Sequence, residues 1–129
     1  MAKLSKILLV DDDPDFVDAT RAILESKPYE VVVAYDGTEV EGKLKEYSPD
    51  LIILDVMMPQ KDGYKVCSEL KSNPQYAHIP ILLLTAVAEN IPYTRYTKQM
   101  GLETEADDYI DKPVEPPEIL KRVERLLER

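Results

Sequence analysis

The chain has 129 residues, and its 16 lysines and arginines against 25 aspartates and glutamates give a formal net charge of −9. This length predicts one domain that can bury a core without disulfides or a structural metal, so we expect residues 1–129 to form a single domain with no output domain among them. The acidic charge disfavours direct binding to nucleic acid, because a phosphate backbone attracts a basic surface. The single Cys67 and the lack of an apolar run of about 20 residues predict a cytoplasmic protein that does not enter a membrane.

Five short apolar runs divide the chain, and each is followed by an amphipathic stretch. The runs cover residues 7–10, 31–34, 51–54, 81–84 and, more weakly, 109–110. Continuous apolar runs of about four to eight residues are typical of strands buried on both faces of a parallel sheet. We therefore predict five parallel strands.

Helical spacing of apolar residues predicts a helix after each of these strands. The predicted helices lie around residues 16–24, 40–47, 66–70, 90–101 and 119–127. Asp13-Pro14 predicts where the first helix begins, since aspartate caps helix N-termini and proline suits the first helical position. Five strand–helix repeats predict a three-layer (βα)5 α/β sandwich with right-handed crossovers.

Charged and hydroxyl side chains follow the predicted strands at the point where each strand ends. They are Asp11, Asp12 and Asp13 after the first strand, Asp55 after the third, Thr85 after the fourth, and Asp111 and Lys112 after the fifth. Sites in open parallel sheets form outside the carboxyl ends of the strands. The sequence therefore predicts that several carboxylates, one hydroxyl and one ammonium meet at one edge.

These residue types suit phosphoryl transfer. Carboxylates packed together repel one another unless a cation neutralises them, and Mg²⁺ is commonly bound through one or two carboxylates. A carboxylate beside such an ion can attack phosphorus and form an aspartyl phosphate. Lys112 and Thr85 are suited to stabilise the charge on the transferring oxygens.

Four segments in chain order carry a resemblance to a known family. They are Ile7-Leu-Leu-Val-Asp-Asp-Asp-Pro-Asp15, Pro49-Asp-Leu-Ile-Ile-Leu-Asp55-Val-Met-Met-Pro59 followed by Asp62-Gly63, Leu84-Thr85-Ala86, and Ala106-Asp-Asp-Tyr-Ile-Asp-Lys112-Pro113. They resemble the acidic, phosphoacceptor, switch and lysine segments of the receiver domains of two-component response regulators. The resemblance covers essentially the whole chain and implies a flavodoxin-like, doubly wound sheet with strand order 2-1-3-4-5.

The resemblance also implies a role for each matching residue. Asp55 would be the phosphoacceptor, and Thr85 and Lys112 would bind the phosphoryl group. Asp12 would bind Mg²⁺ directly and Asp11 mostly through water, with Asp55 and the Met57 backbone carbonyl as further metal ligands. Tyr109 occupies the place of an aromatic side chain that switches together with the Thr85 hydroxyl.

Other polar residues are expected to have structural roles. We interpret Asp13 as the helix cap, and Asp107 and Asp108 as solvated loop charges. His78 is expected on the surface and Cys67 in the core.

The partners that the resemblance implies are a sensor histidine kinase or a histidine phosphotransfer protein as donor, and a downstream protein target or output domain. It also implies either a monomer or a dimer that depends on phosphorylation. The residues Leu102-Glu103-Thr104-Glu105 lengthen the segment before Ala106 relative to the family pattern. This insertion falls on the face that family members use for dimerisation, so the family's usual dimer is in doubt here.

Three functions are compatible with these residues. The favoured one is a phosphorylation-controlled signalling module, which is not an enzyme beyond catalysing its own phosphorylation and dephosphorylation. The second is a small phosphohydrolase like the haloacid-dehalogenase superfamily, although the run Asp11-Asp12-Asp13-Pro14-Asp15 departs from that family's pattern. The third is a docking module that is never phosphorylated.

Overall fold

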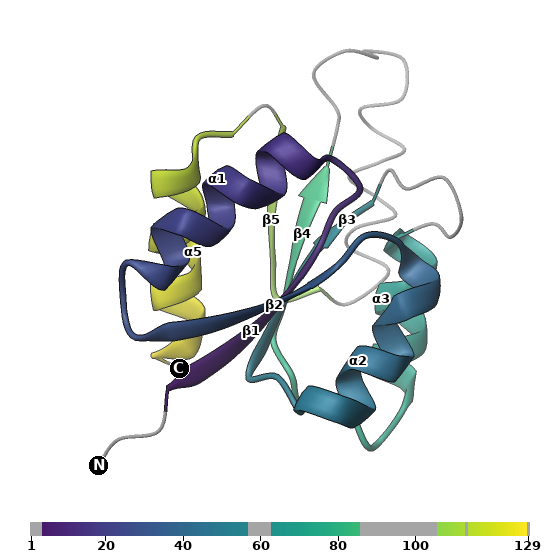
Figure 1. The fold of residues 1–129 in the computed structure, drawn as a ribbon. Coiled ribbons are helices and arrows are strands. Elements are labelled where there is room, and N and C mark those ends of the chain that lie inside the picture. The colour runs from purple at the N-terminus through teal and green to yellow at the C-terminus, as the bar shows by residue number, and fades with distance from the viewer. Residues whose placement is uncertain (1–3, 57–62, 86–105, 113, 129) are drawn as a thin grey trace.

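The computed structural model describes residues 4–56, 63–85, 106–112 and 114–128. Its sheet consists of β1 (Ser5–Val10), β2 (Tyr29–Ala34), β3 (Leu51–Asp55), β4 (Ile81–Thr85) and β5 (Asp108–Asp111). The strand order is β2-β1-β3-β4-β5, and every neighbouring pair is parallel. The predicted flavodoxin-like order is therefore confirmed (Figure 1).

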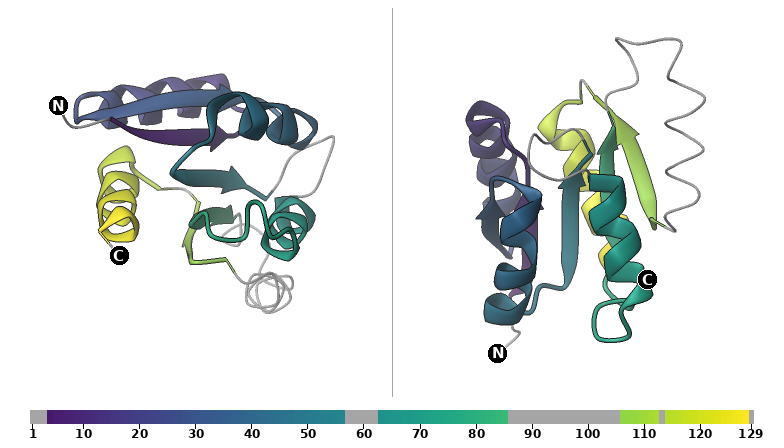
Figure 2. Two further views of the ribbon diagram at one scale, coloured as in Figure 1. Left: turned by 90° about the horizontal axis from the view of Figure 1, so that it is seen from below. Right: turned by 90° about the vertical axis from the view of Figure 1, so that its right-hand side faces the viewer.

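Helices cover both faces of this sheet. On one face lie α1 (Pro14–Glu25) and α5 (Pro116–Leu127), and on the other α2 (Val40–Tyr47) and α3 (Gly63–Ser72), as Figures 1 and 2 show. The helix predicted around residues 90–101 lies outside the described residues. None of the helices in the described ranges combines the length and apolar character that crossing a membrane requires.

The core has two halves, one on each face of the sheet. Along β1, Ile7 and Leu9 pack on the side of α1 and α5, whereas Leu8 and Val10 pack on the side of α2 and α3. Every residue of β3 and β4 is buried. These strands read as continuous apolar runs because side chains on both of their faces leave water.

Asp13 begins α1 as predicted. Its carboxylate accepts the backbone N–H groups of Asp15 at 3.1 Å and Phe16 at 3.5 Å, and Pro14 follows at the first helical position. The cap satisfies N–H groups that the helix itself leaves unpaired. It also fixes the direction in which the chain leaves the sheet directly after Asp11 and Asp12.

Asp107 is not a solvated loop charge, and that prediction was wrong. Its Oδ2 accepts the Lys71 ammonium at 2.8 Å and the Ile81 backbone N–H at 2.8 Å. Lys71 also donates to the Ala77 and Ile79 carbonyls, at 3.2 and 2.9 Å. One ammonium at the end of α3 therefore links the segment before β4 to the segment before β5.

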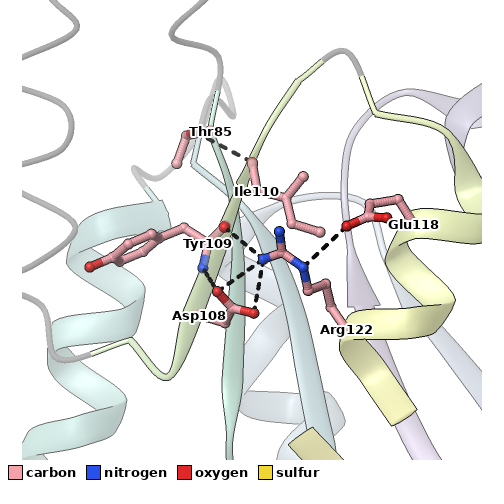
Figure 3. A network of polar contacts seen from close by, with 6 residues as sticks. All are labelled: Thr85, Asp108, Tyr109, Ile110, Glu118 and Arg122. Atoms are coloured by element: carbon pink, nitrogen blue, oxygen red, sulfur yellow. Dashed lines mark hydrogen bonds and ion pairs between the residues drawn. The ribbon is translucent and has the colours of Figure 1, made fainter. Parts of the chain in front are cut away.

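Asp108 was also wrongly interpreted as a loop charge, because it is the first residue of β5 and forms an ion pair. Both of its carboxylate oxygens accept Arg122 of α5, at 3.1 and 3.0 Å. Arg122 further donates to Glu118 at 3.3 Å and to the Tyr109 carbonyl at 3.3 Å (Figure 3). The network joins α5 to β5 within the chain.

We predict that Lys71→Met lowers the free energy of unfolding by about 3 kcal/mol, because it removes the ion pair between Lys71 and the mostly buried Asp107 carboxylate. Urea unfolding followed by circular dichroism measures the change. Lys65→Met is the matched control, since Lys65 is exposed on the same helix. Equal stabilities for the two variants would contradict the role given to Lys71.

Candidate functional site

The carboxylates of Asp11 and Asp55 meet because they follow neighbouring strands in register. Val10 of β1 pairs with Leu54 of β3, and each aspartate comes next in its chain. Asp11 is wholly buried and Asp55 is 2% exposed. Backbone geometry thus brings two ionisable groups together at the carboxyl edge of the sheet.

Asp12 completes a cluster of three carboxylates. One oxygen from each of Asp11, Asp12 and Asp55 lies within 4.8 Å of the others. Asp12 is exposed to solvent, unlike the other two. The cluster therefore has one carboxylate that is in contact with water.

Lys112 supplies the compensating positive charge. It comes one residue after β5, which is an edge strand of the sheet. Its Nζ donates to Asp11 Oδ2 at 2.8 Å and lies 3.6 Å from Asp55 Oδ2. Burial alone lowers the pKa of the ammonium, but the hydrogen bond to Asp11 and the charge of Asp55 outweigh it, so the pKa of Lys112 lies above its ordinary value. The side chain is therefore a cation at neutral pH.

The aromatic ring of Phe16 supports this lysine. Nζ of Lys112 lies 4.5 Å from the centre of the ring, in the first turn of α1. The negative face of an aromatic ring attracts a cation at this distance. The sequence predicts Phe16 only as the start of a helix around residues 16–24. Its position three residues after the Asp13 cap was the available signal that it lies at the site.

Both oxygens of Asp11 are already engaged by the protein. Oδ2 accepts Lys112, and Oδ1 accepts the backbone N–H of Asp13 at 3.0 Å. The Asp11 backbone N–H in turn donates to the Ala34 carbonyl of β2 at 3.1 Å. Asp11 is consequently held in place, and its oxygens have less capacity for a further ligand than those of Asp12.

Gly63 allows α3 to begin directly against the backbone of Asp55. A Cβ at this position would lie 2.3 Å from the Asp55 carbonyl oxygen, which no side chain tolerates. The Gly63 N–H donates to the Val56 carbonyl at 3.2 Å. The close approach explains why a glycine follows Asp62 and limits how far the Asp55 backbone can move.

Thr85 and Tyr109, the two predicted switch residues, have side-chain contacts outside the carboxylate cluster. The Thr85 hydroxyl donates to Asp111 Oδ1 at 2.7 Å. The Tyr109 ring packs against the core half beneath α2 and α3 and lies on the opposite side of β5 from Arg122 (Figure 3). The Asp111 contact was missed in the sequence, because it depends on the pairing of Thr85 with Asp111 across β4 and β5.

The donor set fits a hard divalent cation. Three carboxylates offer oxygen ligands only, and one of them is exposed, which matches the way Mg²⁺ binds through a few carboxylates while keeping several waters. Met57, whose carbonyl was predicted as a further ligand, lies outside the described residues. The predicted residues Asp11, Asp12, Asp55 and Lys112 are thus brought together.

We predict that Asp12→Asn stabilises the metal-free protein by about 1 kcal/mol, since it relieves repulsion between unit charges about 4 Å apart in water. Urea unfolding in EDTA measures the effect. Asp18→Asn is the control, because it removes an equal charge from an exposed position of α1. Added Mg²⁺ should then stabilise the wild type more than Asp12→Asn, since a ligand stabilises only the state that binds it. A destabilised Asp12→Asn protein in EDTA would contradict the repulsion.

Known proteins are similar in sequence to this chain over nearly its whole length. The family model of the response regulator receiver domain matches residues 7–124. The alkaline phosphatase synthesis transcriptional regulatory protein PhoP of Bacillus subtilis is 44% identical over 124 residues, which cover 96% of this chain and 49% of PhoP. The chain spans about half the length of the curated relatives it matches.

Solved structures agree with this similarity. A putative response regulator from Chloroflexus aurantiacus superposes with a TM-score of 0.87 at 35% identity, covering 98% of this chain and 100% of that one. The BeF3-activated N-terminal receiver domain of RstA from Klebsiella pneumoniae gives a TM-score of 0.80 at 34% identity, covering 97% and 100%. The chain therefore belongs to the family of response regulator receiver domains, the signalling modules of two-component systems.

Proposed function

We propose that this chain is a phosphoacceptor whose nucleophile is Asp55. The observation that carries the proposal is the gathering of Asp11, Asp12 and Asp55 within 4.8 Å, with the Lys112 ammonium against two of them. A cluster of like charges is expensive to bury and is typical of a functional site. Family membership supports the same role.

The transfer is a displacement at phosphorus. A carboxylate oxygen of Asp55 attacks the phosphorus of a phosphohistidine, the phosphorus–nitrogen bond breaks as the phosphorus–oxygen bond forms, and the bonding electrons leave with the imidazole. Lys112 lies 3.6 Å from Asp55 Oδ2 and can pair with the negative oxygens of the phosphoryl group. The burial of Asp55 keeps this interaction in a medium where it is stronger than in water.

Asp12 and Asp55 are the proposed direct ligands of Mg²⁺. Asp11 is proposed to act mostly through water, which is supported by the engagement of both its oxygens with Lys112 and the Asp13 N–H. When bound, Mg²⁺ would offset the negative charge of the carboxylates and of the phosphoryl oxygens. The Met57 carbonyl stays a predicted further ligand.

Phosphorylation is proposed to change the conformation through Thr85, Lys112 and Tyr109. A phosphoryl dianion on Asp55 attracts the nearby ammonium and offers acceptors to the Thr85 hydroxyl. Movement of that hydroxyl changes the space next to Tyr109, which is only partly buried and follows Asp108 in β5. The new contacts shift a pre-existing balance between two states.

The proposed donor is a sensor histidine kinase or a histidine phosphotransfer protein, and the target is a downstream protein or an output domain. PhoP and the DNA-binding dual master transcriptional regulator RpaA are named as transcriptional regulators, and each is about twice as long as the region that matches this chain. We propose that this chain controls such an output, without itself binding nucleic acid or membrane, as a monomer or a phosphorylation-dependent dimer. Its only catalysis is the formation and hydrolysis of its own aspartyl phosphate.

Incubation with acetyl phosphate and Mg²⁺ is expected to add the mass of one phosphoryl group to the wild-type chain. Asp55→Ala should add none, because the attacking carboxylate is gone, whereas Asp18→Ala, a change at an exposed acid of α1, should react as the wild type does. Intact mass spectrometry measures both. Equal uptake by Asp55→Ala would overturn the proposal, and steady turnover of an aryl phosphate would favour a phosphohydrolase instead.

A further inference from the structure

The Thr85 hydroxyl is held by a residue that has no part in the proposed transfer. It donates to Asp111 Oδ1 at 2.7 Å and has a longer contact of 3.4 Å with the Ile110 carbonyl (Figure 3 shows the latter). Thr85 is 5% exposed and Asp111 is exposed at the rim of the sheet. The hydroxyl is therefore ordered by a carboxylate that water can reach.

Strand register places the two residues side by side. Thr85 of β4 pairs with Asp111 of β5, so both side chains leave the sheet on the same face. That face is the one covered by α2 and α3, because Leu83, two residues before Thr85, belongs to its core half. Ile53 packs on the opposite face, and Asp55 lies two residues further along β3, so its side chain leaves the sheet on that same opposite face. The bond to Asp111 thus draws the hydroxyl toward the face that Asp55 does not share.

A hydroxyl has one proton and can donate one strong hydrogen bond at a time. The Asp111 carboxylate and a phosphoryl group on Asp55 are therefore competing acceptors for Thr85. The Lys112 N–H donates to the Thr85 carbonyl at 2.5 Å, which ties the end of β4 to the residue after Asp111. Rotation about the Thr85 Cα–Cβ bond turns the hydroxyl away from Asp111, and threonine has more than one accessible rotamer.

We infer that Asp111 is a positioning residue that holds the Thr85 hydroxyl in the unphosphorylated state and so opposes activation. This inference rests on the proposed function, because it concerns the hydroxyl that would bind the phosphoryl group. Phosphorylation has to break the Thr85–Asp111 bond before the new one can form. Asp111 therefore affects the balance between the inactive and the activated conformation of the domain.

Beryllofluoride, a mimic of the phosphoryl group, tests this competition by calorimetric titration at saturating Mg²⁺. Asp111→Ala should bind it roughly three- to tenfold more tightly than the wild type, the range that corresponds to one hydrogen bond exchanged in competition with water. Asp111→Asn keeps an acceptor oxygen and should stay close to the wild type. Glu115→Ala, which removes an exposed charge from the start of α5, should change nothing.

A double-mutant cycle separates the hydrogen bond from a general effect of charge. In a Thr85→Val background there is no hydroxyl to hold, so adding Asp111→Ala should leave the affinity unchanged. Circular dichroism and urea unfolding test whether each variant is folded. Asp111 is exposed, so we expect its substitution to leave the fold intact.

Three results would overturn the inference while leaving the proposed function intact. They are wild-type affinity for Asp111→Ala, an equal gain for Asp111→Ala and Asp111→Asn, and a gain that persists with Thr85→Val. A folded wild-type chain that binds neither beryllofluoride nor a phosphoryl group would instead overturn both.

Discussion

The structure depends on one electrostatic constraint, which is that three carboxylates share a space of 4.8 Å at the end of a parallel sheet. Adjacent β1 and β3 end in register, which brings the carboxylates of Asp11 and Asp55 close together. Lys112, delivered by β5, is the cation that makes the arrangement tolerable, and its hydrogen bond to Asp11 spans almost the whole length of the chain. The order of the strands in the sheet therefore determines which charged side chains lie together at the site.

This constraint explains several residues in the segments next to the site. Gly63 lets α3 begin against the Asp55 backbone, and the Asp13 cap turns α1 away directly after the acidic residues. The first turn of α1 then lays the Phe16 ring against the Lys112 ammonium. The exposed Asp12 adds negative charge without a cation partner among the described residues, and a bound cation would offset the resulting repulsion.

The fold and most of the site could be predicted from sequence because they follow from local pattern. Continuous apolar runs predict the strands, and the polar residues at the end of these runs include Asp11, Asp12, Asp55 and Lys112. Side-chain pairing across the fold could not be predicted in this way. Asp107 and Asp108 looked like loop charges, since their partners Lys71 and Arg122 lie far away in the sequence. The Thr85 contact with Asp111 likewise needs the register of β4 against β5, which no spacing within one segment reveals.

Asp11, Asp12, Asp55 and Lys112 come from distant segments of the chain, and we propose that they form one cation-binding pocket. A crystal grown with Mn²⁺ in place of Mg²⁺ tests it most directly, because the anomalous signal of manganese locates the ion without reference to the protein. We predict one strong peak within ligand distance of the carboxylates of Asp12 and Asp55, with the Lys112 ammonium beside it. A metal bound at another part of the surface, with these side chains apart, would contradict the account.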